Sequence, residues 1–353
     1  MRAGFGKIES DDREVHAMHG YVIEMLECAA CHGSLVWQID EADGDRIETA
    51  DATCGDCRMS YPVREGIGVF LLSDFSRDDL WAQMEGWLPK YLREHPDVER
   101  LLMESPLDTL DPADQRFRAN VLEERGQLDE ALAVRAEATP VYTAEQLTAS
   151  EDQTEYVLRF LEASEGPVVD LASGGGALVE EIARSLDRPV IATDFSPTIL
   201  RRARIRLQHL GLYDRVSLLA FDARQTPLRN SSVQTMTSNQ GLPNIREPGP
   251  LLTELRRVVS GHFAAMTIFY DEEDQSNAAA IRELQVTDLL YRDRAVAAFR
   301  TAGWEVEILN SRSALARPTP RSQLLGVGID GLPVVETTLD YCVLLATSAA
   351  SEL

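Results

Sequence analysis

The stretch "VVDLASGGGALVEEIAR", residues 168–184, limits the possible fold of this chain more than any other segment. A short valine-rich run leads into three consecutive glycines, Gly174, Gly175 and Gly176, and then into apolar residues at helical spacing. A buried strand, a tight glycine turn and a helix are the first unit of an open, mostly parallel α/β sheet. Strand-like and helix-like stretches alternate from there onward, so we expect residues 151–353 to form one α/β domain.

The preceding residues divide by composition into three segments. Residues 1–20 are a polar lead-in, residues 21–73 hold four of the five cysteines, and residues 74–150 are acidic with helical periodicity. In "DDLWAQMEGWLPKYLREH" apolar residues recur three and four positions apart, which predicts an amphipathic helix. This middle region is either a helical linker or a lid whose aromatic residues Trp81, Trp87 and Tyr91 face a binding site. The sequence leaves both interpretations open.

The charge balance argues against several partners. The formal net charge is −24, and Lys7 and Lys90 are the only lysines. Such a field repels nucleic acid and anionic membrane surfaces. The densest basic stretch, "RRARIR" at 201–206, is interpreted as a solvated helix face because its arginines point in several directions. With no apolar run of about 18 residues and no secretory signal, we expect a cytoplasmic protein without a membrane span.

The cysteines form two C-x-x-C pairs. Cys28 and Cys31 make the first pair, and Cys54 and Cys57 make the second. Four thiolates in two tight turns can surround one tetrahedral zinc ion and close its coordination shell, so we predict a structural Zn²⁺ site rather than a catalytic one. The gap between the pairs slightly exceeds the usual range of about 15–20 residues. Disulfides are disfavoured in a cytoplasmic chain, and the neighbouring His32 is a possible substitute ligand.

The segment around these cysteines resembles a known module. The runs "YVIEMLECAACHGSL" and "CGDCRMSYPVREGIGVFLL" are similar to the small zinc-ribbon protein that partners and activates methyltransferases of the translation machinery. The resemblance covers the cysteine pairs, the leucine-rich lead-in and the "YPVREGI" tail. It implies that residues 21–73 form a zinc ribbon attached to an enzyme domain.

The glycine spacing and the acids at the strand ends indicate what the loop binds. A dinucleotide fingerprint counted from Gly174 requires a third glycine at the position of Val179, so a nicotinamide-dependent enzyme is disfavoured. Asp170, Asp194 and Asp222 each end an expected strand. An acid in the position of Asp194 accepts hydrogen bonds from ribose hydroxyls. Together these residues favour an adenosine with a positively charged tail, which is the form of S-adenosylmethionine.

Four stretches resemble, in order, the motifs of class I S-adenosylmethionine-dependent methyltransferases. They are "VVDLASGGG", "ATDFSP", "FDARQTPL" and "TMTSNQGLPNI". The resemblance extends over 151–353. It implies a Rossmann-like α/β fold with a seven-stranded sheet, in which "AVAAFRTAGWEVEIL" and "DYCVLLATS" supply strands six and seven and the last strand is antiparallel. Cys342 in the last stretch is expected to be a buried strand residue.

The resemblance also implies the residues around the methionine tail. Asp170 would help to hold the amino group of the cofactor. Ala172, Gly174 and Gly176 lie in the loop that passes close to that tail, and Asn239 would lie near the methyl donor.

The adenosine half follows from the next two motifs. Asp194 would bind the ribose, and Phe195 would stack near the adenine. Asp222 and Ala223 would contact the adenine rim. For both aspartates the alternative is a structural role as the N-cap of a following helix.

The methyl acceptor is not fixed by the sequence. Methyl transfer from a sulfonium depends mainly on positioning, so few obligatory residues are expected, and no catalytic residue is assigned. Candidates near the acceptor are found at the ends of strands four and five: Asn239, Gln240, Asn244, Tyr270 and Asp271. Segment 311–336, with Arg312, Arg317 and Arg321, is either a solvated loop or a cover over the pocket.

Three functions therefore remain in competition. The first is a methyltransferase acting on a small molecule or a protein, which the acidic charge favours. The second is a methyltransferase of ribosomal or transfer RNA, because zinc ribbons are also fused to such enzymes. The third is a zinc-ribbon adaptor whose methyltransferase-like domain is inactive.

Overall fold

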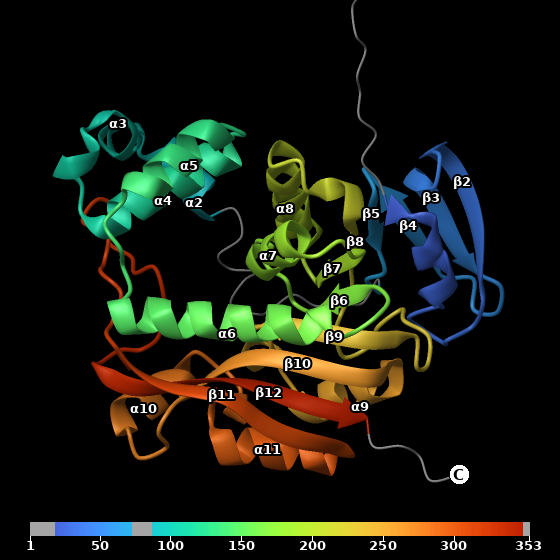
Figure 1. The fold of residues 1–353 in the computed structure, drawn as a ribbon. Helices are drawn as coiled ribbons and strands as arrows, with labels where there is room; N and C mark the ends of the chain where they lie inside the picture. Colours follow the sequence, from blue (N-terminus) through green and yellow to red (C-terminus); the bar gives the residue numbers. More distant parts are fainter. Residues whose placement is uncertain (1–17, 73–86, 349–353) are drawn as a thin grey trace, which may run out of the picture.

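The computed structural model describes residues 18–72 and 87–348, which are built around one 12-stranded sheet (Figure 1). Hydrogen-bonded neighbours follow the order β1-β3-β4-β5-β8-β7-β6-β9-β10-β12-β11, and β2 pairs with β3 outside this path. Most of the predicted lead-in and the expected helix residue Trp81 lie outside the described residues. Within the described ranges, no helix has the length and apolarity needed to cross a bilayer.

The C-terminal part of this sheet has the predicted Rossmann-like topology. Parallel pairing joins the central strands β8 (Val216–Ala220), β7 (Val190–Asp194), β6 (Val168–Asp170), β9 (Val233–Asn239) and β10 (Val259–Phe269). The last strand, β12 (Thr337–Ser348), lies antiparallel between β10 and β11 (Trp304–Ala316). The α/β fold class with an antiparallel last strand is therefore confirmed, and Cys342 is fully buried in β12 as expected.

Helices cover both faces of the parallel strands because successive strand residues point to opposite sides. Val168 and Leu218 pack on one face under α6 (Ala144–Glu162), α7 (Ala177–Ser185) and α8 (Pro197–His209). Val169 and Leu219 face the other layer, which contains α9 (Pro248–Val258) and α11 (Arg292–Thr301). The same C-terminal part of the chain also contains the short helices η3 (Tyr213–Arg215), η4 (Leu242–Asn244), α10 (Gln275–Glu283) and η5 (Asp288–Leu290).

The N-terminal cysteine-bearing region extends the same sheet. Its elements are β1 (Met18–His19), η1 (Gly20–Met25), β2 (Leu35–Asp43), β3 (Arg46–Cys54), β4 (Ser60–Arg64) and β5 (Ile67–Val69). The antiparallel pairs end at β5, which pairs in parallel with β8 in the register Ile67 to Leu218. Backbone hydrogen bonds thus join the region 21–73 to the α/β domain, although the predicted domain boundaries themselves stay a prediction.

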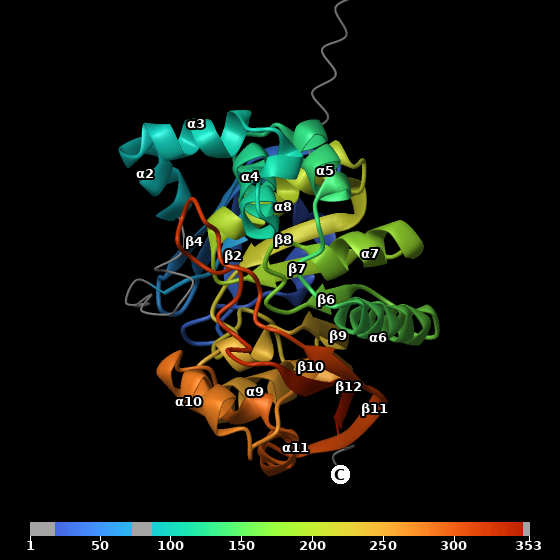
Figure 2. The ribbon, with the colours of Figure 1, turned by 90° about the vertical axis from the view of Figure 1, so that its left-hand side faces the viewer.

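The acidic middle region is helical, as its periodicity predicts. It contains α2 (Trp87–Glu94), α3 (Pro96–Glu104), η2 (Leu107–Thr109), α4 (Pro112–Glu124) and α5 (Leu128–Glu137). Asp111 caps α4 by accepting hydrogen bonds from the backbone N–H groups of Ala113 and Asp114. Apolar side chains of α2, α3 and α4 form a cluster with Leu325 from the β11–β12 connection. Figure 2 shows this connection, in red, rising from the sheet toward α2 and α4.

The arginines of "RRARIR" are not a solvated helix face, which corrects the prediction. They lie on α8 and pair with acids from both accessory regions. Arg201 and Arg204 bind Glu65 in the β4–β5 turn, whereas Arg206 binds Glu123 on α4. Arg202 also binds α4, through Glu124. These charges therefore hold the two accessory regions to α8 and do not form an unpaired basic patch.

The close packing of β5 on β8 makes a testable prediction at Gly68. A Cβ atom at this position would lie 2.9 Å from Cδ2 of Leu219 and 3.0 Å from Cε2 of Phe70, and both side chains are buried. We expect Gly68→Ala to lower the free energy of unfolding by about 1–3 kcal/mol through overpacking, measured by urea denaturation. Gly249→Ala is the control, because nothing lies within 4 Å of its Cβ position. Equal stability of the two variants would contradict the tight β5–β8 contact.

Candidate functional site

A cavity of about 1260 Å³ opens at the carboxyl ends of the parallel strands. The neighbours of β6 run to opposite sides there, so the following loops diverge and leave a crevice, the usual ligand position in open α/β sheets. Most of the predicted cofactor residues line this cavity: Ala172, Gly174, Asp194, Phe195, Asp222, Ala223 and Asn239. The sheet topology therefore brings four separate sequence motifs together.

Asp170 and Gly176 do not line the cavity. Asp170 is buried at the end of β6, where Thr237 donates a 2.7 Å hydrogen bond to its Oδ1 atom. Its Oδ2 atom is buried and has no partner among the described residues. Burial, together with the nearby charge of Asp194, raises the pKa of Asp170 to about 6. The predicted contact of Asp170 with an amino group stays a prediction.

The glycine loop is held in a strained backbone conformation. Gly176 has a φ of 81° and begins α7, and Ala172 has a φ of 53° although it carries a side chain. Gln240, in the loop after β9, has a φ of 55°. A Cβ atom on Gly241 would lie only 2.6 Å from Cβ of Ala172, so the loops after β6 and β9 touch. Strained residues of this kind concentrate at binding sites.

Asp194 connects the glycine loop to β7. Its Oδ2 atom accepts a 3.1 Å hydrogen bond from the backbone N–H of Gly174, and its Oδ1 atom accepts one of 3.0 Å from Ser196. The side chain that caps α8 belongs to Ser196, which accepts from the N–H of Ile199. The interpretation of Asp194 as the helix cap is therefore wrong, and its carboxylate lies at the cavity wall instead.

Asp222 has a partner that the sequence reasoning missed. Arg224 donates to both carboxylate oxygens, with its Nη2 atom 2.8 Å from Oδ2 and its Nε atom 3.0 Å from Oδ1. The same guanidinium reaches Glu247 at 2.6 Å. No helix follows Asp222 before β9 in this described part of the chain, so a helix-capping role does not apply. Because Arg224 is only two positions after Asp222 in the sequence, this ion pair could have been predicted.

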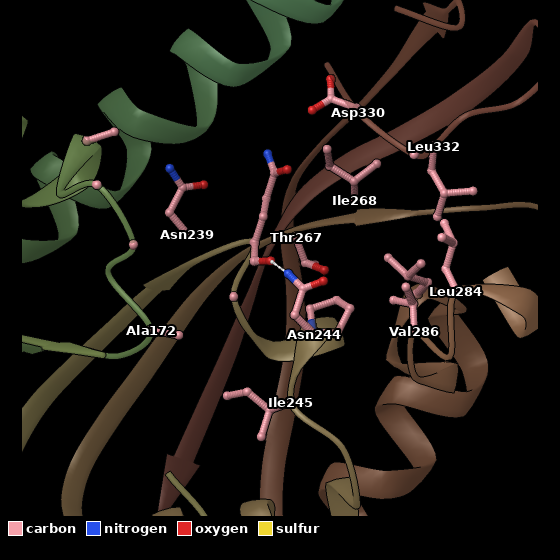
Figure 3. Close-up of a pocket in the computed structure, with 18 of the residues that line it drawn as sticks. Ala172, Asn239, Asn244, Ile245, Thr267, Ile268, Leu284, Val286, Asp330 and Leu332 are labelled. Carbon is pink, nitrogen blue, oxygen red and sulfur yellow. Dashed lines mark hydrogen bonds between the residues drawn. The ribbon is translucent and has the colours of Figure 1, made fainter. Parts of the chain in front are cut away.

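The ends of β9 and β10 supply most of the predicted acceptor candidates. Asn239, Gln240, Asn244 and Tyr270 line the cavity. Figure 3 shows Asn239 across the cavity from Leu284 and Val286, and the hydrogen bond of 3.3 Å from Asn244 to the carbonyl of Gln240. The Oδ1 atom of Asn239 has no partner among the described residues. Asp271 is exposed outside the cavity, where it accepts from the N–H of Glu273.

The side of the cavity opposite the glycine loop was predicted only in part, through segment 311–336. It is formed by the start of α6, by 284–290 and by 318–334. The segment 311–336 therefore does cover the cavity, but of its arginines only Arg321 is part of the wall. Arg312 pairs with Asp152, and Arg317 pairs with Glu336.

The helical region contributes to this wall indirectly. Trp87 and Tyr91 do not line the cavity as a lid would require, because they stack on each other within the helical cluster. Instead, α4 anchors the covering segment. The hydroxyl of Ser322 donates to the carboxylate of Asp114, and the backbone N–H of Gln323 donates to Asp111 at 2.9 Å.

A second site lies in the N-terminal region. The sulfur atoms of Cys28, Cys31, Cys54 and Cys57 all lie within 4.8 Å of one another. A tetrahedral ion with Zn–S bonds of about 2.3 Å requires sulfurs about 3.8 Å apart, and two of the S–S separations are 3.5 and 3.6 Å. The hydroxyl of Tyr61 contacts the sulfur of Cys28 at 3.2 Å. This set could hold a tetrahedral metal ion.

The surroundings of the cluster exclude His32 as a substitute ligand in this arrangement. Its Nδ1 atom lies 2.8 Å from Oε1 of Glu27, away from the group of four sulfurs. Gly33 allows the two turns to approach each other, because a Cβ atom there would lie 3.1 Å from the sulfur of Cys54. The four predicted cysteines are therefore brought together without a fifth ligand.

The buried carboxyl of Asp170 predicts a pH effect on stability. Its pKa is raised in the fold, so its contribution is fully present below the ordinary value near 4 and is lost as the pH rises through about 6. Asp170→Asn removes this ionisation. As the pH rises from 4 to 7, the unfolding free energy of the variant should increase by up to about 3 kcal/mol relative to that of the wild type. Urea denaturation at several pH values measures this, and parallel curves would contradict it.

Comparisons with known proteins agree with this geometry. Residues 168–261 match a family model described as a methyltransferase domain. Over 115 residues the chain is 30% identical to demethylmenaquinone methyltransferase from Lactiplantibacillus plantarum, covering 32% of this chain and 48% of that one. It is 37% identical over 92 residues to the enzyme of that name from Clavibacter sepedonicus, covering 26% and 36%.

The similarity does not span the whole chain. This chain covers less than half the length of these two curated relatives. Among solved structures, the YcgJ protein from Bacillus subtilis superimposes with a TM-score of 0.46 at 14% identity, covering 56% of this chain and 98% of that one. The similarity to a methyltransferase domain is thus placed at residues 168–261.

Proposed function

We propose that this protein is an S-adenosylmethionine-dependent methyltransferase that acts on a small molecule. The observation that carries the proposal is the single cavity wall formed by the glycine loop, Asp194, Asp222 and Asn239. Each of these comes from a different strand end, and each is a residue type suited to one part of the cofactor. The matched methyltransferase domain supports the same conclusion.

The polar groups of the wall fit this cofactor. Asp194 would accept hydrogen bonds from the ribose hydroxyls, while its hydrogen bond to Gly174 keeps the loop in place. The unpartnered Oδ1 atom of Asn239 could accept from the amino-acid tail. When bound, the cofactor supplies an activated methyl group on a sulfonium. The chain's own residues then act mainly by holding the acceptor in line with that group.

A small acceptor is favoured over a nucleic acid. The cavity continues past the cofactor residues to an apolar wall formed by Leu284, Val286 and Leu332. The arginines of α8, the densest basic stretch of the sequence, are occupied by carboxylates. The curated relatives are named for demethylmenaquinone, which is also a small molecule.

We further propose that the four cysteines bind a structural zinc ion. Four thiolates would complete its shell and leave no open position for chemistry. Cys54 is the last residue of β3, and Cys57 lies in the turn between β3 and β4. Strand β4 then leads into β5. Bound zinc would therefore stabilise the strands through which the N-terminal region joins the central sheet.

Cofactor binding tests the main proposal. We expect S-adenosylmethionine to bind with micromolar or tighter affinity in calorimetry, and Asp194→Ala to weaken it at least ten-fold by removing a charge-assisted hydrogen bond. Asp187→Ala is the control, because that side chain is 97% exposed. A wild-type protein that binds no cofactor would favour the inactive adaptor. A gel shift with total RNA at low salt would support the RNA enzyme.

Metal analysis tests the zinc site. We expect one zinc per chain by mass spectrometry, and a Cys54→Ser, Cys57→Ser variant should lose it together with several kcal/mol of stability. Cys342→Ala should keep the metal, because that thiol is buried in β12 away from the cluster. Full stability of the chelated protein, or unchanged zinc in the double variant, would argue against the site.

A further inference from the structure

The cavity wall contains three carboxylates, and one of them differs from the others in its partners. Asp194 accepts hydrogen bonds from two backbone N–H groups, and Asp222 is paired with Arg224. Asp330 belongs to the segment between β11 and β12. No ion pair among the described residues joins it to an arginine or a lysine, and the nearby phenol of Tyr142 acts to lower its pKa. Its carboxylate therefore keeps acceptor capacity for a ligand.

The backbone and the aromatic neighbours hold Asp330 in position. Its N–H donates a 3.0 Å hydrogen bond to Oγ1 of Thr319, which fixes the turn that carries it. Tyr142 is held in turn by the guanidinium of Arg116, 5.8 Å from the centre of its ring. Burial raises the pKa of Asp330, while Tyr142 and Arg116 oppose that effect. Tyr142 and Arg116 therefore favour the charged form of this carboxyl group.

The surface around Asp330 is that of an acceptor site for an apolar molecule. Figure 3 shows Asp330 above Ile268 and beside Leu332, with Leu284 and Val286 on the same side of the cavity. Asn239 lies on the opposite side, with the predicted cofactor residues. A molecule between the two sides would bury its body against aliphatic side chains, and Asp330 would be the negatively charged group available to it on the acceptor side.

We infer that Asp330, supported by Tyr142, binds the methyl acceptor, and that this acceptor is an apolar molecule bearing a hydrogen-bond donor, an amine or a hydroxyl. The inference rests on the proposed methyltransferase function, because it assigns the opposite wall to the cofactor. A carboxylate accepts a hydrogen bond from either donor, and a cationic amine adds charge attraction. An acceptor with a carboxylate in the same place would be repelled. Asp330 is thus a specificity determinant, and no bond to it forms or breaks.

Three probes with one apolar body test this inference. Phenethylamine, 2-phenylethanol and 3-phenylpropionate would be titrated into the full-length protein saturated with S-adenosylhomocysteine, and binding followed by ligand-observed NMR. We expect the amine to bind most tightly, the alcohol next and the carboxylate least. Asp330→Asn should weaken amine binding about ten-fold or more and reduce the discrimination against the carboxylate. Tyr142→Phe should have a smaller effect in the same direction.

The controls separate this inference from the proposal on which it rests. Asp271→Asn removes an exposed acid near the end of β10, outside the cavity, and should leave all three affinities unchanged. Calorimetry with S-adenosylhomocysteine on each variant reports the cofactor site independently. Equal amine affinity in the wild type and Asp330→Asn, or no binding of either donor probe to a protein that binds S-adenosylhomocysteine, would overturn the inference. Amine binding that depends on Asp330 in a protein without cofactor affinity would instead overturn the proposed function alone.

Discussion

The parallel pairing of β6 with both β7 and β9 is the interaction on which the site depends. Val168 and Asp170 pair with β7 on one side and with β9 on the other. Strands β7 and β8 therefore lie on one side of β6, and β9 and β10 lie on the other. The loops after β6 and β9 must separate at the carboxyl edge of the sheet. Ala172 and Gly241, which both line the cavity, still lie close to each other. Without this reversal, the motifs would lie on one continuous edge with no crevice between them.

The two accessory regions are joined to this centre by different forces. The N-terminal region shares backbone hydrogen bonds, because β5 continues the sheet beyond β8. The described residues of the helical region form no strand, and this region is held through apolar packing and the arginines of α8. Single exposed ion pairs contribute about 0–1 kcal/mol. Arg206 is more effective because it is only 23% exposed and binds Glu180 and Glu123 together. The planar guanidinium suits such double contacts, which lysine cannot make in the same geometry.

Local sequence patterns were sufficient for the central fold. The valine-rich runs, the glycine turn and the aspartates at strand ends all depend on neighbours within a few residues, so the central strands and the side of the cavity formed by their ends could be predicted. Asp170 shows the limit of this reasoning. Its position before the glycines was correct, but whether its carboxyl faces the cavity or the interior depends on Thr237, a residue of another strand. The partner of Asp222 was close in sequence and could have been considered.

Features set by distant contacts could not be predicted in this way. The parallel β5–β8 pair joins residues from two regions of different composition, and nothing local in "GIGVF" specifies its partner. The partners of the α8 arginines come from the β4–β5 turn and from α4, so a solvated face was the reasonable expectation for an isolated helix. Asp330 belongs to the covering segment, which is hydrogen-bonded to Asp111 and Asp114 at the distant α4.

The match to a known family covers only one side of the cavity. The matched methyltransferase domain spans 168–261 and includes the glycine loop and the strand-end aspartates. The acceptor side of the cavity is formed instead by the start of α6, by 284–290 and by 318–334, all of which lie outside that match. The proposed cofactor residues and the proposed acceptor residues therefore lie in different parts of the chain. If the proposed function holds, a relative that shares the first part constrains the donor of the methyl group, whereas the choice of acceptor depends on the covering segment and on the helices that hold it.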